Sequence, residues 1–252
     1  MKHCDVLLHR VAKNYFGGSL NFSLQPEDVE TMTWDWQQKF LDVTINSELV
    51  KQYPLSCTFS KLFFKKLISY LENQEVHDDL YIYLCQSLNR EHNENGFSYR
   101  HHVIGKNISE VISIKEMNKM VVDGTTGMRT WEAALMLADW ALCNKDTFCN
   151  KKVLELGSGV GFTGALILDW NAIDDLSSSI VPDMVIGSDI VYDPVIIQPL
   201  CDVLKMFFDR NKLLDVYIAS AMKFRYKKLP LNERVYIEWD QSIEMCLLQI
   251  NC

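Results

Sequence analysis

The chain has 252 residues, of which 48% are hydrophobic and 23% charged, a composition typical of one or two folded globular domains. No stretch approaches the roughly 20 consecutive apolar residues that a helix needs to cross a bilayer, so we expect no membrane span. The formal net charge of −8 argues against a nucleic-acid backbone as a direct partner, because such binding needs clustered lysine and arginine.

The N-terminal residues and the cysteines point to an intracellular protein. The short apolar stretch at the N-terminus is interrupted by Asp5, His9 and Arg10, so it does not predict a signal peptide. The eight cysteines form no C-x-x-C pair and have no zinc-finger spacing with histidine, so we expect no metal site. Free thiols in apolar patterns are typical of a reducing compartment, which predicts a cytoplasmic protein.

The first part of the chain is predicted to be mainly helical. The acidic, tryptophan-containing stretch Glu27–Trp36 predicts one or two short helices. From Thr58 to Leu71 apolar residues recur at three- and four-residue steps, and Asp78–Leu88 repeats leucine on one face. We expect these two segments to form a helical hairpin. The stretch Tyr99–Ile114 has a β-type pattern with a turn at Gly105, which predicts a β-hairpin.

The second part of the chain alternates strands and helices. We predict helices at Thr130–Cys143 (with Thr130 as N-cap), Phe162–Ile167 and Pro194–Phe208, and strands at Lys152–Leu156, Met184–Ser188, Asp215–Ala221 and Ile243–Ile250. This alternation predicts an α/β fold with a mainly parallel sheet. We therefore place an N-terminal, mainly helical region at residues 1–98 and a second domain at residues 99–252.

A glycine loop follows the first strand of this second domain, in the sequence VLELGSGVGFTG. Gly157, Gly159 and Gly161 at alternate positions allow the backbone to turn sharply and to approach a ligand with no side chain in the way. The pattern favours a nucleotide-type cofactor and is typical of S-adenosylmethionine sites, which often carry an acidic residue where Glu155 stands.

Two other interpretations of the glycine loop remain open. The residues from Gly159 to Gly164 also fit G-x-G-x-x-G, the dinucleotide fingerprint. That fingerprint needs an acidic residue at the end of the next strand, about 20 positions on, whereas Asp183 precedes a strand. The loop could also be a purely structural turn.

Two further motifs add candidate site residues. Asp189 and Tyr192 follow an apolar strand at its carboxyl end, the edge of an open α/β sheet where ligands bind. There they could receive and orient an amine, although a turn-capping Asp and a packed Tyr are the structural alternative. Trp131 follows the sequence GTTGMRT and is predicted to lie in the first turn of the helix Thr130–Cys143, although a Trp on an amphipathic helix is also often part of a core.

Together these motifs resemble one family. The order TTGMRTWEAALMLADWA, VLELGSGVGFTG, LDWN and PDMVIGSDIVYDP resembles the class I, seven-β-strand protein-lysine methyltransferases that carry a D-x-x-Y signature. Within that family the elongation factor 2 lysine methyltransferases are the most similar, and the N-terminal helical stretch and the tail IEWDQSIEMCLLQI extend the resemblance over most of the chain. The resemblance implies a Rossmann-like methyltransferase sheet.

The resemblance also implies a role for each motif residue. Gly157, Ser158 and Gly159 would line the methionine and ribose portion of S-adenosyl-L-methionine, and Trp131 and Trp170 would pack on the cofactor. Ser188 stands where the family has a small residue beside the cofactor, typically alanine. Asp189 and Tyr192 would face the incoming lysine as the catalytic pair.

The resemblance implies transfer of a methyl group to a lysine of translation elongation factor 2. The lysine must be neutral to act as the nucleophile, and a water-poor pocket favours loss of its proton. We expect Asp189 to accept a hydrogen bond from the amine and Tyr192 to shape the pocket. A monomer is expected, with a protein substrate and no direct contact to nucleic acid or membrane.

The chain is shorter than the family pattern within the catalytic core. Only 27 residues separate Gly161 from Asp189, where the resemblance implies about 70–80 residues with two strands and a ribose-binding carboxylate. We therefore predict an incomplete sheet, shortened between residues 167 and 183 and between residues 222 and 240. Two other hypotheses remain: a catalytically inactive, truncated binding protein, and a dinucleotide-dependent oxidoreductase.

Overall fold

The computed structural model of this chain describes residues 3–90, 96–105, 108, 110–118, 126–163, 167–168, 181–221, 237, 239–240 and 242–250. The chain divides into two compact units, Met1–Met120 and Val121–Cys252. The first unit includes the β-hairpin that the sequence led us to assign to the second domain. The division therefore falls at residue 120 and differs from the boundary between residues 98 and 99 that we predicted.

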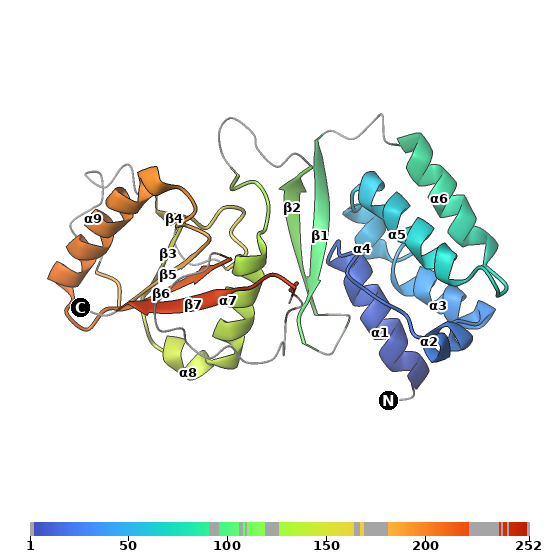
Figure 1. Cartoon of the computed structure of the whole chain (residues 1–252), viewed down its shortest axis with the longest axis horizontal. Coiled ribbons are helices and arrows are strands. Elements are labelled where there is room, and N and C mark those ends of the chain that lie inside the picture. The colour runs from blue at the N-terminus through green and yellow to red at the C-terminus, as the bar shows by residue number, and fades with distance from the viewer. Residues whose placement is uncertain are drawn as a thin grey trace. The chain divides into compact units, whose positions relative to one another are not determined.

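The first unit is helical, followed by one β-hairpin (Figure 1). Its elements are α1 (His3–Phe16), α2 (Pro26–Thr31), α3 (Trp34–Val43), α4 (Glu48–Gln52), α5 (Cys57–Tyr70), α6 (Asp78–Arg90), β1 (Phe97–Val103) and β2 (Val111–Met117). Helices α5 and α6 pack together and β1 pairs with β2 in antiparallel register, which confirms both predicted hairpins. The sequence did not lead us to predict α1, because Asp5 and Arg10 interrupt its apolar pattern; both lie on its exposed side.

Aromatic side chains form the core of the first unit. The Tyr15 ring of α1 lies 5.1 Å from the Phe63 ring of α5 in an edge-on arrangement, and the fully buried Phe40 of α3 lies beside both. Edge-on and tilted aromatic pairs of this kind add to the stabilisation from burial.

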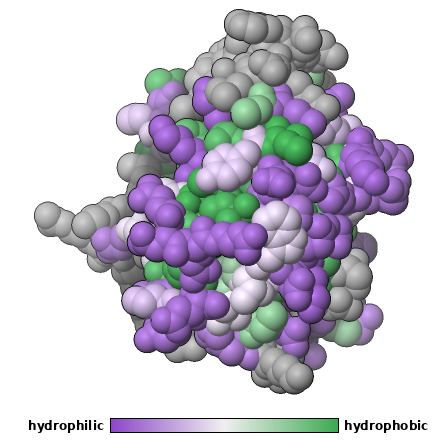
Figure 2. All heavy atoms as spheres, turned by 90° about the vertical axis from the view of Figure 1, so that its right-hand side faces the viewer, coloured by the Kyte–Doolittle hydropathy of each residue, from purple (hydrophilic) through white to green (hydrophobic). Residues whose placement is uncertain are grey.

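Figure 2 shows one face of the molecule, where hydrophilic side chains surround a smaller apolar area near the middle of the view.

Two adjacent histidines of β1 are buried in this unit. His101 lies between the Ser113 hydroxyl and the Tyr53 carbonyl, at 2.9 Å from each. Burial, reinforced by Arg100 and His101, lowers the pKa of His102 to about 3, and burial also lowers the pKa of His101. Both rings are therefore neutral in the folded protein at neutral pH.

We expect the first unit to lose stability as the pH falls below about 6.5. The unfolded His102 takes up a proton near pH 6.5 whereas the folded one does so near pH 3, so the free energy of unfolding drops by up to about 1.4 kcal/mol per pH unit between these values. Hydrogen exchange of the β1 amides at several pH values measures this drop. His102→Leu should flatten the profile relative to wild type, and equal slopes for the two proteins would contradict the expectation.

The second unit is an α/β fold, as predicted. Its elements are α7 (Glu132–Cys143), α8 (Lys145–Phe148), β3 (Val153–Leu156), β4 (Ile167–Leu168), β5 (Met184–Ser188), α9 (Pro194–Arg210), β6 (Asp215–Ser220) and β7 (Cys246–Ile250). The described strands form one sheet in the order β4-β3-β5-β6-β7, in which β7 alone pairs in antiparallel fashion. Because β4 and β5 lie on opposite sides of β3, the strand order reverses between β3 and β5.

Helices α7 and α9 cover opposite faces of this sheet (Figure 1). Successive side chains of a strand point to opposite faces, so Val185 of β5 packs in the cluster with α9, whereas Met184 and Ile186 pack in the cluster with α7. Strands covered on both faces require continuous apolar runs, and the β5 sequence MVIGS meets that requirement.

Two local predictions in this unit are wrong. Thr130 is not the N-cap of α7: Trp131 takes that place, because its backbone is extended and its carbonyl accepts the hydrogen bond from Ala134 at 2.9 Å. Trp131 therefore precedes the first turn. Residues 162–167 were predicted to be helical, but Ile167 lies in β4, opposite Glu155 of β3.

The predicted shortening of the sheet falls largely outside the described residues. Trp170 and the rest of 169–180 lie there, as do residues 222–236. After residues 222–236, the backbone that leads into β7 is hydrogen-bonded to side chains of α7. The Ile237 N–H donates to Asp139 at 2.9 Å, and the Asp240 N–H donates to Glu132 at 2.7 Å. These bonds connect α7 directly to the segment that leads into β7.

Candidate functional site

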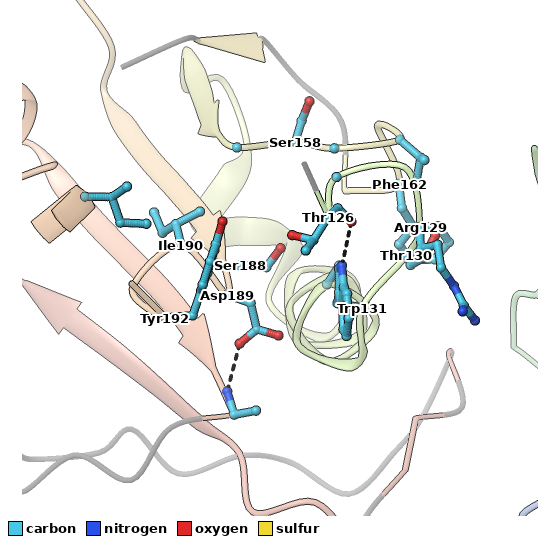
Figure 3. Close-up of a pocket in the computed structure, with 17 residues that line it drawn as sticks. Thr126, Arg129, Thr130, Trp131, Ser158, Phe162, Ser188, Asp189, Ile190 and Tyr192 are labelled. Atoms are coloured by element: carbon cyan, nitrogen blue, oxygen red, sulfur yellow. Dashed lines mark hydrogen bonds between the residues drawn. The ribbon is translucent and has the colours of Figure 1, made fainter. Parts of the chain in front are cut away.

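A cavity of about 670 Å³ opens at the carboxyl edge of the sheet, where the strand order reverses (Figure 3). Ligands in open α/β sheets bind at such switch points, because the loops after the two flanking strands diverge there. The lining comes from the segment before α7, the loop after β3, the turn after β5, and single residues of α7, α9 and the β6 end. It comprises Thr126, Gly127, Arg129, Thr130, Trp131, Ala134, Gly157, Ser158, Gly159, Val160, Phe162, Ser188, Asp189, Ile190, Tyr192, Ile196 and Ala221.

The glycine loop forms one wall of the cavity. Gly157, Gly159 and Gly161 all have positive φ, at 64°, 54° and 80°, in the region that side-chain-bearing residues rarely adopt. A Cβ atom at Gly159 would lie 2.8 Å from the carbonyl oxygen of Gly127, whereas one at Gly161 would meet nothing within 4 Å. Gly159 therefore allows the loop to lie directly against the backbone that precedes α7.

Ser158 lies between these glycines and is 8% exposed. Its buried hydroxyl has no hydrogen-bond partner among the described residues. A buried hydroxyl without a partner carries a desolvation cost, so such a group on a cavity wall is suited to a polar ligand.

Trp131 forms another wall. Its indole N–H donates to the Thr126 carbonyl at 3.0 Å, which fixes the ring at the start of α7. The side chain is 37% exposed although it is large and apolar, and it lines the cavity. A fixed aromatic face of this kind can pack against a flat or cationic ligand.

Asp189 is held by backbone groups of two residues at the end of β6. Its backbone N–H donates to the Ala219 carbonyl at 2.8 Å, and its Oδ1 accepts from the Ala221 N–H at 2.9 Å. Asp189 has a φ of 49°, a left-handed conformation that Asp tolerates better than most residues.

The environment of Asp189 makes its carboxyl group a weaker acid than a free aspartate. Burial raises the pKa of its carboxyl above the usual range, and the hydrogen bond from the Ala221 N–H limits that rise. Perturbed pKa values of this kind are common at functional sites in clefts.

Ser188 is the last residue of β5, and Tyr192 lies in the turn that follows it. Figure 3 shows Ser188 and Asp189 between Tyr192 on one side and Trp131 on the other. Tyr192 is 59% exposed, so it stands at the mouth of the cavity rather than in its interior.

The structure thus places Trp131, Gly157, Ser158, Gly159, Ser188, Asp189 and Tyr192 around one cavity. Trp170, the remaining predicted site residue, lies outside the described residues. Sequence reasoning missed Gly127, Phe162 and Ala221 as lining residues. Gly127 stands inside the motif TTGMRTW, but nothing in the sequence signals its approach to Gly159.

Curated relatives of this chain carry methyltransferase names. The human protein-lysine N-methyltransferase EEF2KMT is 25% identical over 284 residues, covering 83% of this chain and 84% of the relative. The bovine EEF2KMT is 33% identical over 165 residues, covering 64% of this chain and 46% of that protein. The mouse EEF2KMT is 27% identical over 259 residues, with 80% and 76% covered. These similarities over most of the chain support an EEF2KMT-like protein-lysine methyltransferase. No family model matches this chain.

The alignment with the human EEF2KMT is longer than this chain. The aligned part of this chain amounts to about 209 of its 252 residues. About 75 of the 284 aligned positions are therefore gaps in this chain. We expected about 70–80 residues between Gly161 and Asp189, where this chain has 27, and a second shortening between residues 222 and 240.

Other classes of site find no support in the described part of the chain. No group of three or more His, Cys, Asp or Glu there could hold a metal ion. No described helix is both long and apolar enough to cross a membrane.

Proposed function

We propose that this protein is an S-adenosyl-L-methionine-dependent protein-lysine N-methyltransferase that acts on a lysine of translation elongation factor 2. The observation that supports it best is the meeting of the glycine loop, Trp131 and Asp189 around one cavity at the strand-order reversal. The proposal includes a cytoplasmic monomer whose partner is a protein, with no direct nucleic-acid or membrane contact.

The residues present fit the cofactor. A cavity of about 670 Å³ is within the usual range for small-molecule sites, about 300–1,000 Å³. Gly157, Ser158 and Gly159 would line the methionine and ribose portion, with the Ser158 hydroxyl free for a polar group, and Trp131 would pack on the cofactor. Ser188 would lie beside it, as would Trp170. When bound, the cofactor supplies a methyl group already activated by its sulfonium.

The protein's own task is to position the lysine. An amine can attack only when it is neutral, and free lysine has a pKa of about 10.4. In the proposed mechanism Asp189 accepts a hydrogen bond from the amine through Oδ2, because Oδ1 already accepts the Ala221 N–H. Tyr192 would border the channel through which the side chain enters. Orientation of this kind is the main contribution that an enzyme makes when the cofactor carries the reactive group.

A catalytically inactive binding protein is the second candidate. It is favoured by the roughly 75 aligned positions that this chain lacks relative to the human EEF2KMT. A missing ribose-binding carboxylate would weaken cofactor binding even if the glycine loop is formed.

Titration calorimetry with S-adenosyl-L-methionine separates the two candidates. We expect saturable heat in the micromolar range, because two walls of the site are formed in the described structure. Transfer of labelled methyl from the cofactor to purified elongation factor 2, with factor lacking the modified lysine as control, tests the substrate. Absence of binding heat would contradict the enzyme and support the binding protein.

A further inference from the structure

On the basis of the proposed methyltransferase function, in which the target lysine passes Tyr192 and reaches Asp189, we propose a binding surface for the residues beside that lysine. The surface is formed by Tyr192 and by Val195 and Ile196 of the first turn of α9, and we call it the α9 rim. It binds an apolar side chain that neighbours the lysine in the protein substrate.

The core of the second unit does not account for the apolar first turn of α9. Residues 194–197 read PVII, and Val195 is 79% exposed. A surface helix normally carries polar residues outside the stripe that faces the core. The buried stripe of α9 begins later and recurs at three- and four-residue steps, at Leu200, Val203, Leu204 and Phe207. Val195 therefore contributes little to the core, and its apolar character points to contact with another molecule.

The α9 rim is continuous with the cavity. Tyr192 and Ile196 both line the cavity, and the Ile196 N–H donates to the Asp193 carbonyl at 3.1 Å, which closes a tight turn between them. Val195 lies within that turn, so it extends the apolar surface from the mouth of the cavity into solvent. Figure 3 shows Tyr192 across the cavity from Trp131, which places the α9 rim on one side of the mouth.

The length of a lysine side chain determines what covers the α9 rim. Lysine carries its amine on a flexible four-carbon stem, so a lysine whose amine reaches Asp189 keeps its own backbone near the mouth. The neighbouring residues of the substrate then lie against the surface around the mouth, which includes the α9 rim. Single apolar residues scattered over a surface are ordinary, whereas a group that adjoins a cavity marks an interaction site. An apolar side chain close to the lysine would cover Val195, and removal of both groups from water favours binding.

Val195→Ser in the full chain tests the proposal. Peptides with one central lysine, flanked on each side by two leucines or by two serines, are titrated into the protein by calorimetry. Wild type should bind the leucine peptide about 10-fold more tightly than the serine peptide, whereas the variant should bind both alike. With elongation factor 2 as substrate, kcat/KM should fall by a similar factor while the affinity for S-adenosyl-L-methionine stays unchanged. Because Val195 is mostly exposed, the variant should keep the wild-type Tm.

Leu213→Ser is the matched control. Leu213 is 88% exposed and lies just before β6, at the amino edge of the sheet and therefore away from the cavity at the carboxyl edge. This variant should keep the preference for the leucine peptide. Equal affinities of wild type for the two peptides, or a preference that survives Val195→Ser, would overturn the proposal. A concentration-dependent dimer that Val195→Ser alone abolishes would also overturn it, because a second copy would then cover the α9 rim. If wild type shows the preference but transfers no methyl, the proposed function fails and the α9 rim remains a peptide-binding surface.

Discussion

Replacing Asp189 with asparagine is expected to lower kcat for methyl transfer by about 10²–10³-fold while leaving cofactor affinity nearly unchanged. The carboxylate is the acidic group at the end of β5 that lines the cavity, and in the proposed mechanism its Oδ2 receives the amine. Asparagine keeps an oxygen for the Ala221 N–H but turns an amide that cannot accept toward the lysine. Single-turnover methylation, with calorimetry for the cofactor, measures the two effects separately.

The same substitution is expected not to destabilise the fold. Because burial raises the folded pKa of Asp189 above its unfolded value, the ionised carboxylate costs folding free energy, and that cost grows as the pH rises through the two pKa values. Asp189→Asn should therefore have a Tm equal to or above that of wild type at pH 7, and the difference should vanish in acid. If the variant lost activity because it unfolds, its Tm at pH 7 would instead lie below that of wild type.

Asp193→Asn provides the matched control. Asp193 lies four residues away, does not line the cavity, and caps α9 by accepting the Val195 N–H at 2.9 Å. Asparagine is also a good N-cap, so this variant removes one nearby charge with little structural change. Its rate should stay close to wild type. A wild-type rate for Asp189→Asn would exclude Asp189 from the reaction.

Gly159→Ala is expected to weaken S-adenosyl-L-methionine binding by at least about 10-fold, equivalent to about 1.4 kcal/mol. The added methyl would lie 2.8 Å from the Gly127 carbonyl oxygen, a backbone atom that cannot rotate away. The loop after β3 and the segment before α7 would have to separate, and both line the cavity. Titration calorimetry on the folded variant measures the loss.

Gly161→Ala separates this clash from backbone strain. Both glycines have positive φ, so alanine at either position carries a similar conformational penalty of about 1–2 kcal/mol. A Cβ at Gly161 meets nothing within 4 Å, so this variant should be destabilised but should bind the cofactor nearly as well as wild type. Equal affinities for the two variants would show that the approach of Gly159 to Gly127 does not shape the site.

Much of the architecture could be predicted from the sequence because it depends on local patterns. The apolar run MVIGS predicted β5 at the residues where the structure has it, and the helical periodicity predicted α5, α6 and most of α9. The glycine loop and the D-x-x-Y motif predicted the candidate site. The names of the relatives agree with the methyltransferase interpretation of that loop rather than with the dinucleotide one.

The predictions that failed depended on neighbours that a local pattern does not contain. Ile167 was assigned to a helix, yet it lies in β4 because β3 offers an unpaired edge beside Glu155. Trp131 was placed in the first turn of α7, but its extended backbone makes it the N-cap. The β-hairpin was assigned to the catalytic domain, whereas it groups with the helical unit, where β1 packs against α1.

The sequence by itself determined the family resemblance, the order of most elements and the identity of the candidate catalytic and cofactor residues. Only the tertiary structure decided that Gly159 lies against Gly127, and that Ala219 and Ala221 hold Asp189. Both contacts join segments about 30 residues apart in the sequence. The parallel register of β5 and β6 and the packing of the glycine loop bring these segments together. A local residue pattern does not show which residue about 30 positions away will become a neighbour.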